Sequence, residues 1–443
     1  TLTKKGYKKM KITNKLVILT SLLAFLACDD DLLTVQDPSR YTSPDLDGAL
    51  DAVANGVEGD LYATHDSFVT YSALASDEYQ HTGTWAGWDD VDHGRFKYGT
   101  TSTDGIMNGY LRTRWFANST KERLENVLGT AAATDPMMAQ IQTTKAWALL
   151  MMGEGFCEGV LEDGGDVVTD VQMTTAAIGE LTTAMATAQA AGATAYYNWA
   201  LAGRARANLW LGNWDAALAD AKAVPEGFVH YAQYSGNSSR QQNWIVFVAT
   251  IGYNNAGGVR EKWWSMVDTD AEMLIDPYSG QLDSRVEIWH DPGTLGVDGK
   301  TDFYSQWKYK DGEADVPMTH SDEMKLIEAE VHYQKGDLAG AQTVLNGLRA
   351  AVGLDALPTT TDASVVMEYL MHETFAELWV EGRRMSYLHR WGKTADIFRP
   401  LNDAENLRPL PRPSKFPMSY SEATYNTNID NALSARCLPM SGN

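Results

Sequence analysis

Two segments of this 443-residue chain share one plan: a helix pattern, a glycine followed by a polar residue, and a second helix pattern. The joint is Gly336-Asp337 in residues 324–348 and Gly212-Asn213 in residues 198–224. These offsets resemble tetratricopeptide helix pairs. The two glycines lie 124 positions apart, so the pairs are not tandem repeats and a long insertion must separate them. In the second pair the apolar residues recur at the three-and-four spacing of a helix packed on one side: Leu338, Ala341, Leu345 and Leu348.

Further helix patterns cover residues 46–62, 137–156, 174–191 and 365–389. Residues 226–316 differ, because they are rich in Gly, Asn, Asp and aromatic residues and contain only short β-like runs such as Trp244 to Val248. The sequence therefore predicts a mainly α fold, a tetratricopeptide-like scaffold of helix pairs with a large irregular, loop-rich insert at 226–316. Loops of this kind commonly carry functional surfaces.

The N-terminal 27 residues have the layout of a secretory signal. They carry six lysines and no acidic residue, followed by a run of about a dozen apolar residues, too short for a membrane-spanning helix of about 20 residues. We expect residues 1–27 to be a signal peptide with leader residues and residues 28–443 to form a single domain. The sequence Phe25-Leu26-Ala27-Cys28 resembles a bacterial lipobox, which predicts a lipid on Cys28. An ordinary signal peptide with its cut elsewhere is the alternative.

The charge balance argues against nucleic-acid binding. The chain has 36 Lys and Arg against 58 Asp and Glu, and removal of residues 1–27 takes six lysines, which changes the net charge from −22 to −28. A protein that works by neutralising phosphates needs the opposite sign. Besides Cys28 there are two cysteines, Cys157 and Cys437, and nothing in the sequence pairs them. Since Cys157 follows an apolar stretch, we expect a buried free thiol there.

Carboxylates at 373, 377 and 381 raise the question of catalysis, because a pair of carboxylates can hydrolyse glycosides. At a spacing of four they form a ladder on one helix face with arginines nearby, which favours a salt-bridged structural seam. His372-Glu373 begins like a zinc-protease motif, but Ala376 stands where the second histidine belongs. The histidines and aspartates of residues 81–93 suit a solvated loop as well as a cation site. We expect no enzymatic activity, no catalytic residue, no cofactor and no metal.

Two aromatic clusters are the best candidates for a binding site. A sugar ring offers an apolar face to an aromatic plane and a rim of hydroxyls to polar side chains. For any single ring, a place in the core under a long loop is an equally good interpretation. The candidate ligand-binding residues are Tyr79, His81, Trp85 and Trp88 in a polar stretch, and Tyr253, Asn254, Trp263 and Trp264 in the insert.

Nearly the whole of residues 28–443 resembles SusD/RagB-type surface lipoproteins, most clearly in the C-terminal half. The resemblance rests on Glu323 to Glu330, then Glu377-Leu378-Trp379-Val380-Glu381-Gly382-Arg383-Arg384, and then Leu388-His389-Arg390-Trp391-Gly392. Ser76-Asp77-Glu78 near the start and Leu438-Pro439-Met440 at the end also fit. Arg383 stands where the family usually has His, and Tyr387 stands where it usually has Asp.

This resemblance implies a lipid-anchored protein of the outer membrane, facing the cell exterior. It further implies that the protein binds an oligosaccharide on an aromatic arc and delivers it to a SusC-like TonB-dependent transporter. Asp29-Asp30-Asp31 after Cys28 is similar to the export signal of such lipoproteins. A peptide-binding member of the same family is the alternative, and a surface glycoside hydrolase is the rival from another class.

Overall fold

The computed structural model describes residues 43–95, 101–162, 164–401 and 413–429. The predicted signal peptide and Cys28 lie outside the described residues. The chain divides into two units, Thr1–Leu50 and Asp51–Asn443. In the first, the described part contains the short helix α2 (Ser43–Asp47). Everything below concerns the second unit.

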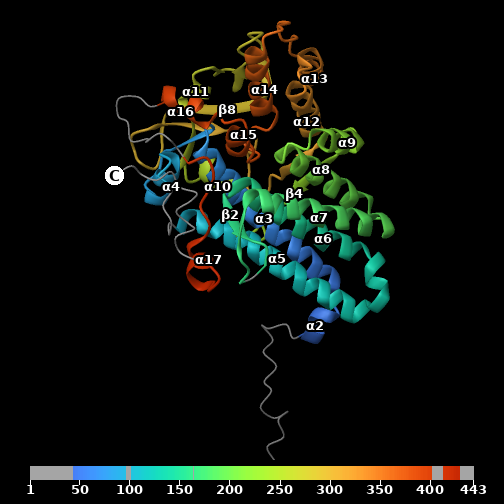
Figure 1. Cartoon of the computed structure of the whole chain (residues 1–443). Helices are drawn as coiled ribbons and strands as arrows, with labels where there is room; N and C mark the ends of the chain where they lie inside the picture. Colours follow the sequence, from blue (N-terminus) through green and yellow to red (C-terminus); the bar gives the residue numbers. More distant parts are fainter. Residues whose placement is uncertain (1–42, 96–100, 163, 402–412, 430–443) are drawn as a thin grey trace, which may run out of the picture. The chain divides into compact units, whose positions relative to one another are not determined.

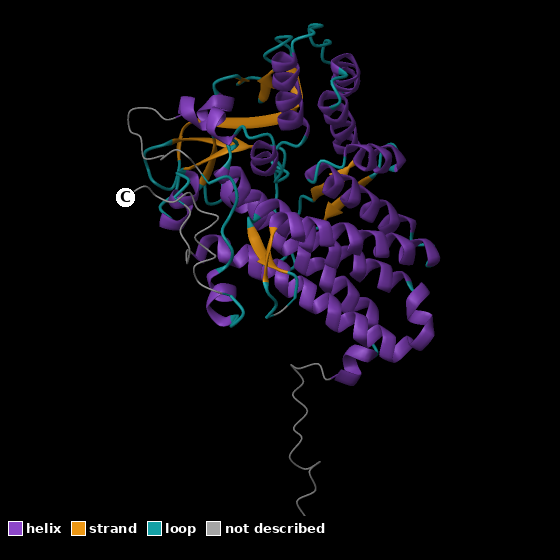
Figure 2. Ribbon diagram, viewed as in Figure 1, coloured by secondary structure: helices purple, strands orange, loops and turns teal. Residues whose placement is uncertain are grey.

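The second unit is mainly helical, as the sequence predicts, and its helices pack in chain order (Figures 1 and 2). Neighbouring helices α5, α6, α7, α8 and α9 contact one another in sequence. No helix of the described residues is both long and apolar enough to cross a membrane. The helices of this part are α3 (Leu50–Ala75), α4 (Ala86–Asp92), α5 (Thr101–Leu128), the 3-10 helix η2 (Gly129–Thr134), α6 (Pro136–Gly155), α7 (Asp170–Ala190), α8 (Thr194–Trp210) and α9 (Trp214–Ala223).

The two predicted helix pairs form and pack on each other, although more than a hundred residues separate them. The second pair is α12 (Ser321–Gln334) and α13 (Leu338–Ala351), and α12 contacts both α8 and α9. At both joints the glycine has a positive φ, 72° at Gly212 and 78° at Gly336, which suits glycine because it has no Cβ. Asp337 then caps α13, since its side chain accepts the backbone N–H of Gly340 at 2.8 Å.

The insert leaves the helical scaffold and returns to it at one place. Strand β4 (Val229–Ala232) pairs antiparallel with β10 (Val316–His320), and α12 begins directly after β10. The insert therefore starts and ends against the scaffold. Between these strands lie α10 (Trp244–Ala249), β5 (Gly257–Val259), α11 (Glu261–Trp264), β6 (Val267–Asp268), β7 (Met273–Ile275), β8 (Leu282–Leu295) and β9 (Asp302–Gln306).

The insert is more regular than the sequence predicts. Strands β6, β7, β8 and β9 form an antiparallel sheet in that order, and β5 pairs with β1 (Tyr79–His81) from the N-terminal part. The predicted β-run at 244–248 is wrong, because these residues form helix α10. Asn243 caps this helix by accepting the backbone N–H groups of Ile245 and Val246 at 2.9 and 3.4 Å. Local β-propensity yields here to the cap and to burial of one helix face.

The helix predicted over 365–389 is two helices, α14 (Ala363–Glu377) and α15 (Arg384–Arg390). Between them Val380 and Gly382 have positive φ values of 53° and 76°. The turn sends Arg383 to Glu323 and Arg384 to Asp77, each a buried ion pair. Buried charges need such partners, and a continuous helix would not bring them together.

Two further sequence predictions need correction, and one helix was not predicted. The helix expected at 46–62 runs as α3 to Ala75, and α5 was missed. Cys157 is disulfide-bonded, not a free thiol, and its partner lies outside the described residues. The remaining described elements are the hairpin β2 (Glu158–Val160) and β3 (Val167–Thr169), α16 (Thr394–Leu401) and α17 (Tyr420–Tyr425).

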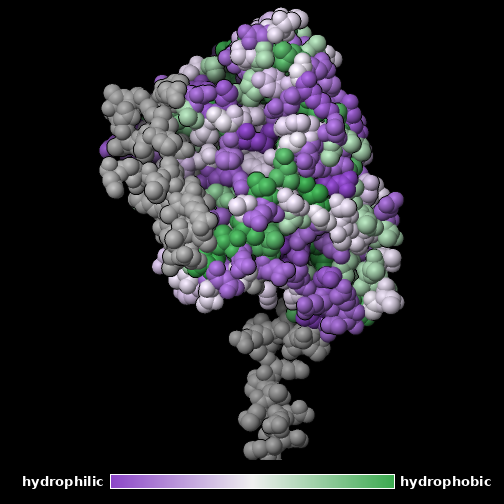
Figure 3. All heavy atoms as spheres, viewed as in Figure 1, coloured by the Kyte–Doolittle hydropathy of each residue, from purple (hydrophilic) through white to green (hydrophobic). Residues whose placement is uncertain are grey.

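Part of the high tryptophan content belongs to the helical core. Trp147 of α6 and Trp199 of α8 are fully buried and stack, with ring centroids 5.6 Å apart and planes at 18°. The indole N–H of Trp147 donates to the backbone carbonyl of Trp199. The surface is different: hydrophilic side chains cover much of the face seen in Figure 3.

Candidate functional site

Three aromatic rings from two distant segments form a row at the surface. Trp85 precedes α4, while Trp244 and Phe247 lie on α10. Trp85 and Trp244 are nearly parallel, at 10° with centroids 6.4 Å apart, and Trp244 and Phe247 lie at 24° with centroids 4.8 Å apart. Trp85 is 37% exposed and Phe247 is 38% exposed. We call Trp85, Trp244 and Phe247 the aromatic row.

Helix α10 sets the geometry of the row. Trp244 and Phe247 are three positions apart and therefore share one side of the helix. Ile245, Val248 and Ala249 are buried. The backbone N–H of Trp244 donates to the Asp66 carboxylate of α3 at 2.8 Å. The first turn of α10 is thus fixed to the scaffold, and the row is held before a ligand arrives.

A cleft of about 660 Å³ opens beside the row. Phe247 contributes to both, and Tyr253, 49% exposed, lines the cleft as well. The turn that carries Tyr253 is tied to α10, because the N–H of Asn254 donates to the carbonyl of Phe247 at 2.9 Å. The cleft lining consists of Gly236, Gln242, Asn243, Val246, Phe247, Tyr253, Asp311, Gly312, Glu313 and Ala314.

The structure separates the predicted ligand-binding residues. Trp85 is in the aromatic row, Tyr253 lines the cleft, and Asn254 fixes the turn between them. His81 lies on β1 with its ring centroid 6.4 Å from that of Trp88, its Nδ1 is 4.0 Å from the Asp89 carboxylate, and its side chain is 7% exposed. Burial lowers the pKa of His81.

Three of the predicted residues are core residues, which corrects their assignment to a ligand surface. Tyr79 is fully buried. Trp88 is buried and donates its indole N–H to the Tyr71 hydroxyl at 2.9 Å. Trp263 stacks on Phe375 of α14 with centroids 3.6 Å apart. Each ring is enclosed where the loop packs on the scaffold, so none offers a face to a ligand.

Trp264 belongs to a different stack. Its ring lies parallel to Tyr304 at 2° with centroids 4.2 Å apart, and Tyr304 stacks in turn on His290. Both faces of Tyr304 are thereby covered. All three rings of this stack are half-buried. The stack is made by α11 with strands β8 and β9, whereas the aromatic row is made by α10 with the segment before α4.

Two residues of the row, Trp244 and Phe247, were missed by the sequence analysis. They were assigned to a β-like run, in which Trp244 and Phe247 would point to opposite faces. The available signal was Asn243 directly before the run, since asparagine is a preferred helix cap.

The carboxylates of the proposed seam are engaged in buried ion pairs. Arg349, fully buried on α13, bonds to Asp276 at 2.8 Å and to Glu373 at 2.6 Å, and Arg285 bonds to Glu373 at 2.9 Å. Hydrogen bonds from His372, Arg349 and Ser279 hold the pKa of Asp276 below its usual range although burial opposes this. Glu381 lies beyond the end of α14, so the three glutamates do not form one helical ladder. Lys308, 2.7 Å from Glu381, and neighbouring His320 lower the pKa of Glu381 to about 2.

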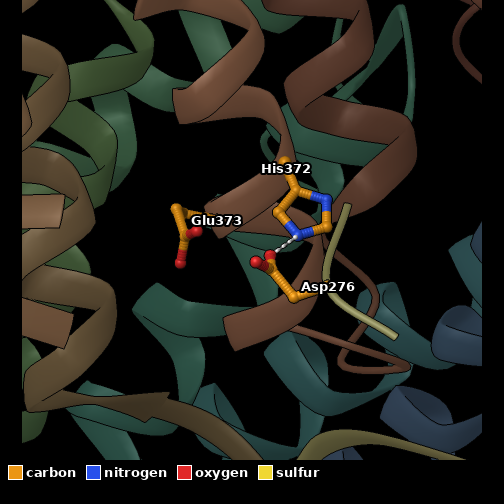
Figure 4. Close-up of side chains that lie close together, drawn as sticks. All are labelled: Asp276, His372 and Glu373. Atoms are coloured by element: carbon orange, nitrogen blue, oxygen red, sulfur yellow. Dashed lines mark ion pairs between the residues drawn. The ribbon is translucent and has the colours of Figure 1, made fainter. Parts of the chain in front are cut away.

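His372 and Glu373 belong to the Arg349 cluster. His372 Nε2 lies 3.2 Å from Asp276, and Glu373 lies on the other side of that carboxylate (Figure 4). Arg349 pairs with Asp276 and Glu373, and Arg285 pairs with Glu373 and with the equally buried Asp283. A cation would have to displace these ion pairs, so the cluster is structural.

Comparison with known proteins agrees with this architecture. The model of the SusD family matches residues 301–432. A SusD superfamily protein from Bacteroides vulgatus superimposes with a TM-score of 0.66 at 14% identity, covering 87% of this chain and 98% of that one. The chain therefore has the fold of SusD-like proteins. A SusD-like carbohydrate-binding protein from Bacteroides fragilis superimposes with a TM-score of 0.64 at 14% identity, covering 86% and 99% of the two chains.

A laminarin-binding SusD-like protein has a TM-score of 0.58 at 15% identity, with coverage of 85% and 98%. No curated protein matches the sequence significantly. The tetratricopeptide-like scaffold predicted from the helix pairs is confirmed by the match to this fold. At these identities the structural neighbours establish the fold and not the ligand.

Proposed function

We propose that this protein captures an oligosaccharide on the aromatic row and in the adjoining cleft, and delivers it to a SusC-like TonB-dependent transporter. The observation that carries the proposal is the exposure of Trp85 beside Phe247 of α10, a helix fixed by its cap and by Asp66. Aromatic planes of this kind stack on the apolar faces of sugar rings. The carbohydrate-binding proteins among the structural neighbours support the same class of ligand.

The protein is proposed to bind its ligand without converting it. In the described residues the glutamates that raised the question of hydrolysis are all close to basic groups: Arg285 near Glu373 and Glu377, and Lys308 near Glu381. A glycosidase needs one carboxyl group free to donate a proton and another free to attack or to activate water. Release of new reducing ends from a bound polysaccharide would contradict this part of the proposal.

Binding should be tested on a glycan array, followed by calorimetry with the best ligand. Trp85→Ala, Trp244→Ala and Phe247→Ala should each weaken binding about fivefold or more, because a stacked ring contributes on the order of 1 kcal/mol. Trp115→Ala is a matched control, since Trp115 is 57% exposed on α5 and outside the row. Wild-type affinity in all three row variants, or binding of peptides in place of glycans, would refute the proposal.

Membrane attachment is proposed through a lipid on Cys28, with the protein on the outer face of the outer membrane. The proposal rests on the lipobox-like sequence before Cys28 and on the acidic residues after it. The variant Cys28→Ala should no longer partition into the detergent phase, because only the thiol can take the lipid. Delivery to the transporter should appear as co-purification of the two proteins from solubilised membranes, and its absence in gentle detergent would contradict the pairing.

A further inference from the structure

The cleft beside the aromatic row has negative charge but no positive charge among its described residues. Asp311 and Glu313 line it and are exposed. Neither forms an ion pair with any residue that the structure describes. The other lining side chains are neutral, and none of them is Lys, Arg or His.

The nearest basic residues in the sequence are engaged elsewhere. Lys310, directly before Asp311, pairs with Glu287 at 2.9 Å and lies over the ring of Trp307. Arg240 pairs with Asp60 and lines a different cleft, against α3. Basic groups adjacent in sequence to the cleft are therefore held by other partners.

The two carboxylates are held in place by backbone contacts. Asp311 accepts the N–H of Glu313 at 2.9 Å, and Glu313 accepts the N–H of Gly236 at 3.1 Å. The loop that carries them is fixed to α10, because the N–H of Asn243 donates to the carbonyl of Gly312 at 2.9 Å. Each carboxylate has further acceptor capacity, since it offers about four lone-pair sites.

We infer that this cleft selects glycans without negative charge, with Asp311 and Glu313 as the specificity-determining residues. This inference rests on the proposed function. A carboxylate accepts hydrogen bonds from sugar hydroxyls, and such charge-assisted bonds are stronger than neutral ones. A uronate or sulfate at the same place would face two carboxylates at short range that have no ion-pair partner among the described residues, and like charges repel even at exposed positions, most at low salt. The ligand class is thus a neutral polysaccharide fragment.

The inference is tested with matched ligands. Neutral oligosaccharides of glucose, mannose and galactose are compared with the same oligosaccharides after their primary hydroxyls have been oxidised to carboxylates. The neutral form that binds should bind about tenfold more tightly than its oxidised counterpart, or better, at low salt. This preference should shrink as salt is raised, whereas the affinity for the neutral form should stay nearly constant.

Charge-neutral variants separate repulsion from shape. In the double variant Asp311→Asn, Glu313→Gln the oxidised ligand should bind more tightly than it binds to the wild type. The neutral ligand should bind several-fold more weakly, because charge-assisted bonds are lost. An unchanged preference in this variant would overturn the inference, since the discrimination would then be steric.

The outcomes distinguish this inference from the proposed function. Tighter binding of the oxidised form, lost in Trp244→Ala, would overturn the inference and leave glycan capture by the aromatic row intact. Binding of neither form, or binding that Trp85→Ala, Trp244→Ala and Phe247→Ala all leave unchanged, would overturn both.

Discussion

The buried carboxyl of Asp66 should make the stability of this protein fall with rising pH. Asp66 lies on α3, is 3% exposed, and accepts the N–H of Trp244. Burial raises its pKa from 3.8 to about 7, although the hydrogen bonds from Trp244 and Ser67 act in the opposite direction. The folded protein therefore holds this proton more tightly than the unfolded chain does.

The sign of the effect follows from proton linkage. Between about pH 4 and pH 7 the folded state keeps the Asp66 proton and the unfolded state does not, so the free energy of unfolding decreases as pH rises. A pKa of about 7 in place of 3.8 corresponds to about 4 kcal/mol, since one pKa unit is worth about 1.36 kcal/mol. The cost is absent below the unfolded pKa and fully present above the folded one.

The variant Asp66→Asn should remove this dependence. Its amide oxygen can still accept the Trp244 N–H, while no charge has to be buried. We expect it to be more stable than the wild type by up to about 4 kcal/mol at about pH 8.5, and to have no such advantage at about pH 4. The measurement is urea-induced unfolding at a series of pH values. Asp215→Asn is the control, because the Asp215 side chain is 93% exposed and its loss should change stability by about 0.5 kcal/mol or less. Parallel stability curves for the wild type and Asp66→Asn over this range would refute the reasoning.

Three further predictions concern the core. Arg349→Met should lower the free energy of unfolding by about 3 to 5 kcal/mol, because it leaves buried carboxylates without their partner. The control Arg112→Met, at a half-exposed side chain, should lower it by about 1 kcal/mol or less. Similar denaturation midpoints for the two variants would contradict this prediction. Trp263→Leu should lower the melting temperature while any folded fraction binds glycan normally, and a selective loss of affinity would return Trp263 to the ligand surface. Ala341→Asp should prevent cooperative folding, as followed by circular dichroism, whereas Ala339→Asp on the exposed face of α13 should melt like the wild type.

The helix pairs were predictable because their information is local. The spacing of Ala341 and Leu345 predicts which face of α13 is buried, and the structure confirms it. The joints at Gly212 and Gly336 were readable for the same reason, since a helix end that needs a positive φ favours glycine wherever it occurs. The predictions failed where contacts with residues distant in the sequence determine the local structure. Helix α14 ends after Glu377 because Arg383 and Arg384 form ion pairs with carboxylates on other elements. The apolar periodicity of residues 365–389 does not indicate these ion pairs.

The sequence predicted which segments supply the aromatic residues of the candidate site, but not which of their rings are exposed. Aromatic residues near Trp85 and in the insert indicated where a binding site could form, and Trp85 and Tyr253 are indeed exposed. The sequence analysis assigned Trp263 to the ligand surface together with these two residues, yet its ring is stacked on Phe375. Trp244 was predicted to lie in a β-like run, although it lies on helix α10 and its ring is at the centre of the row.

The sequence by itself determined the helix pairs, their glycine joints, the acidic balance and the segment that must form an insert, because each depends on spacing or on residue counts. Only the tertiary structure decided which aromatic rings face solvent and which carboxylates lack a basic partner. Trp85 meets Trp244 across 159 positions of sequence, and Asp66 fixes the helix that carries Trp244. Exposure and ion pairing are properties of contacts between distant segments, so no local pattern of residues can specify them.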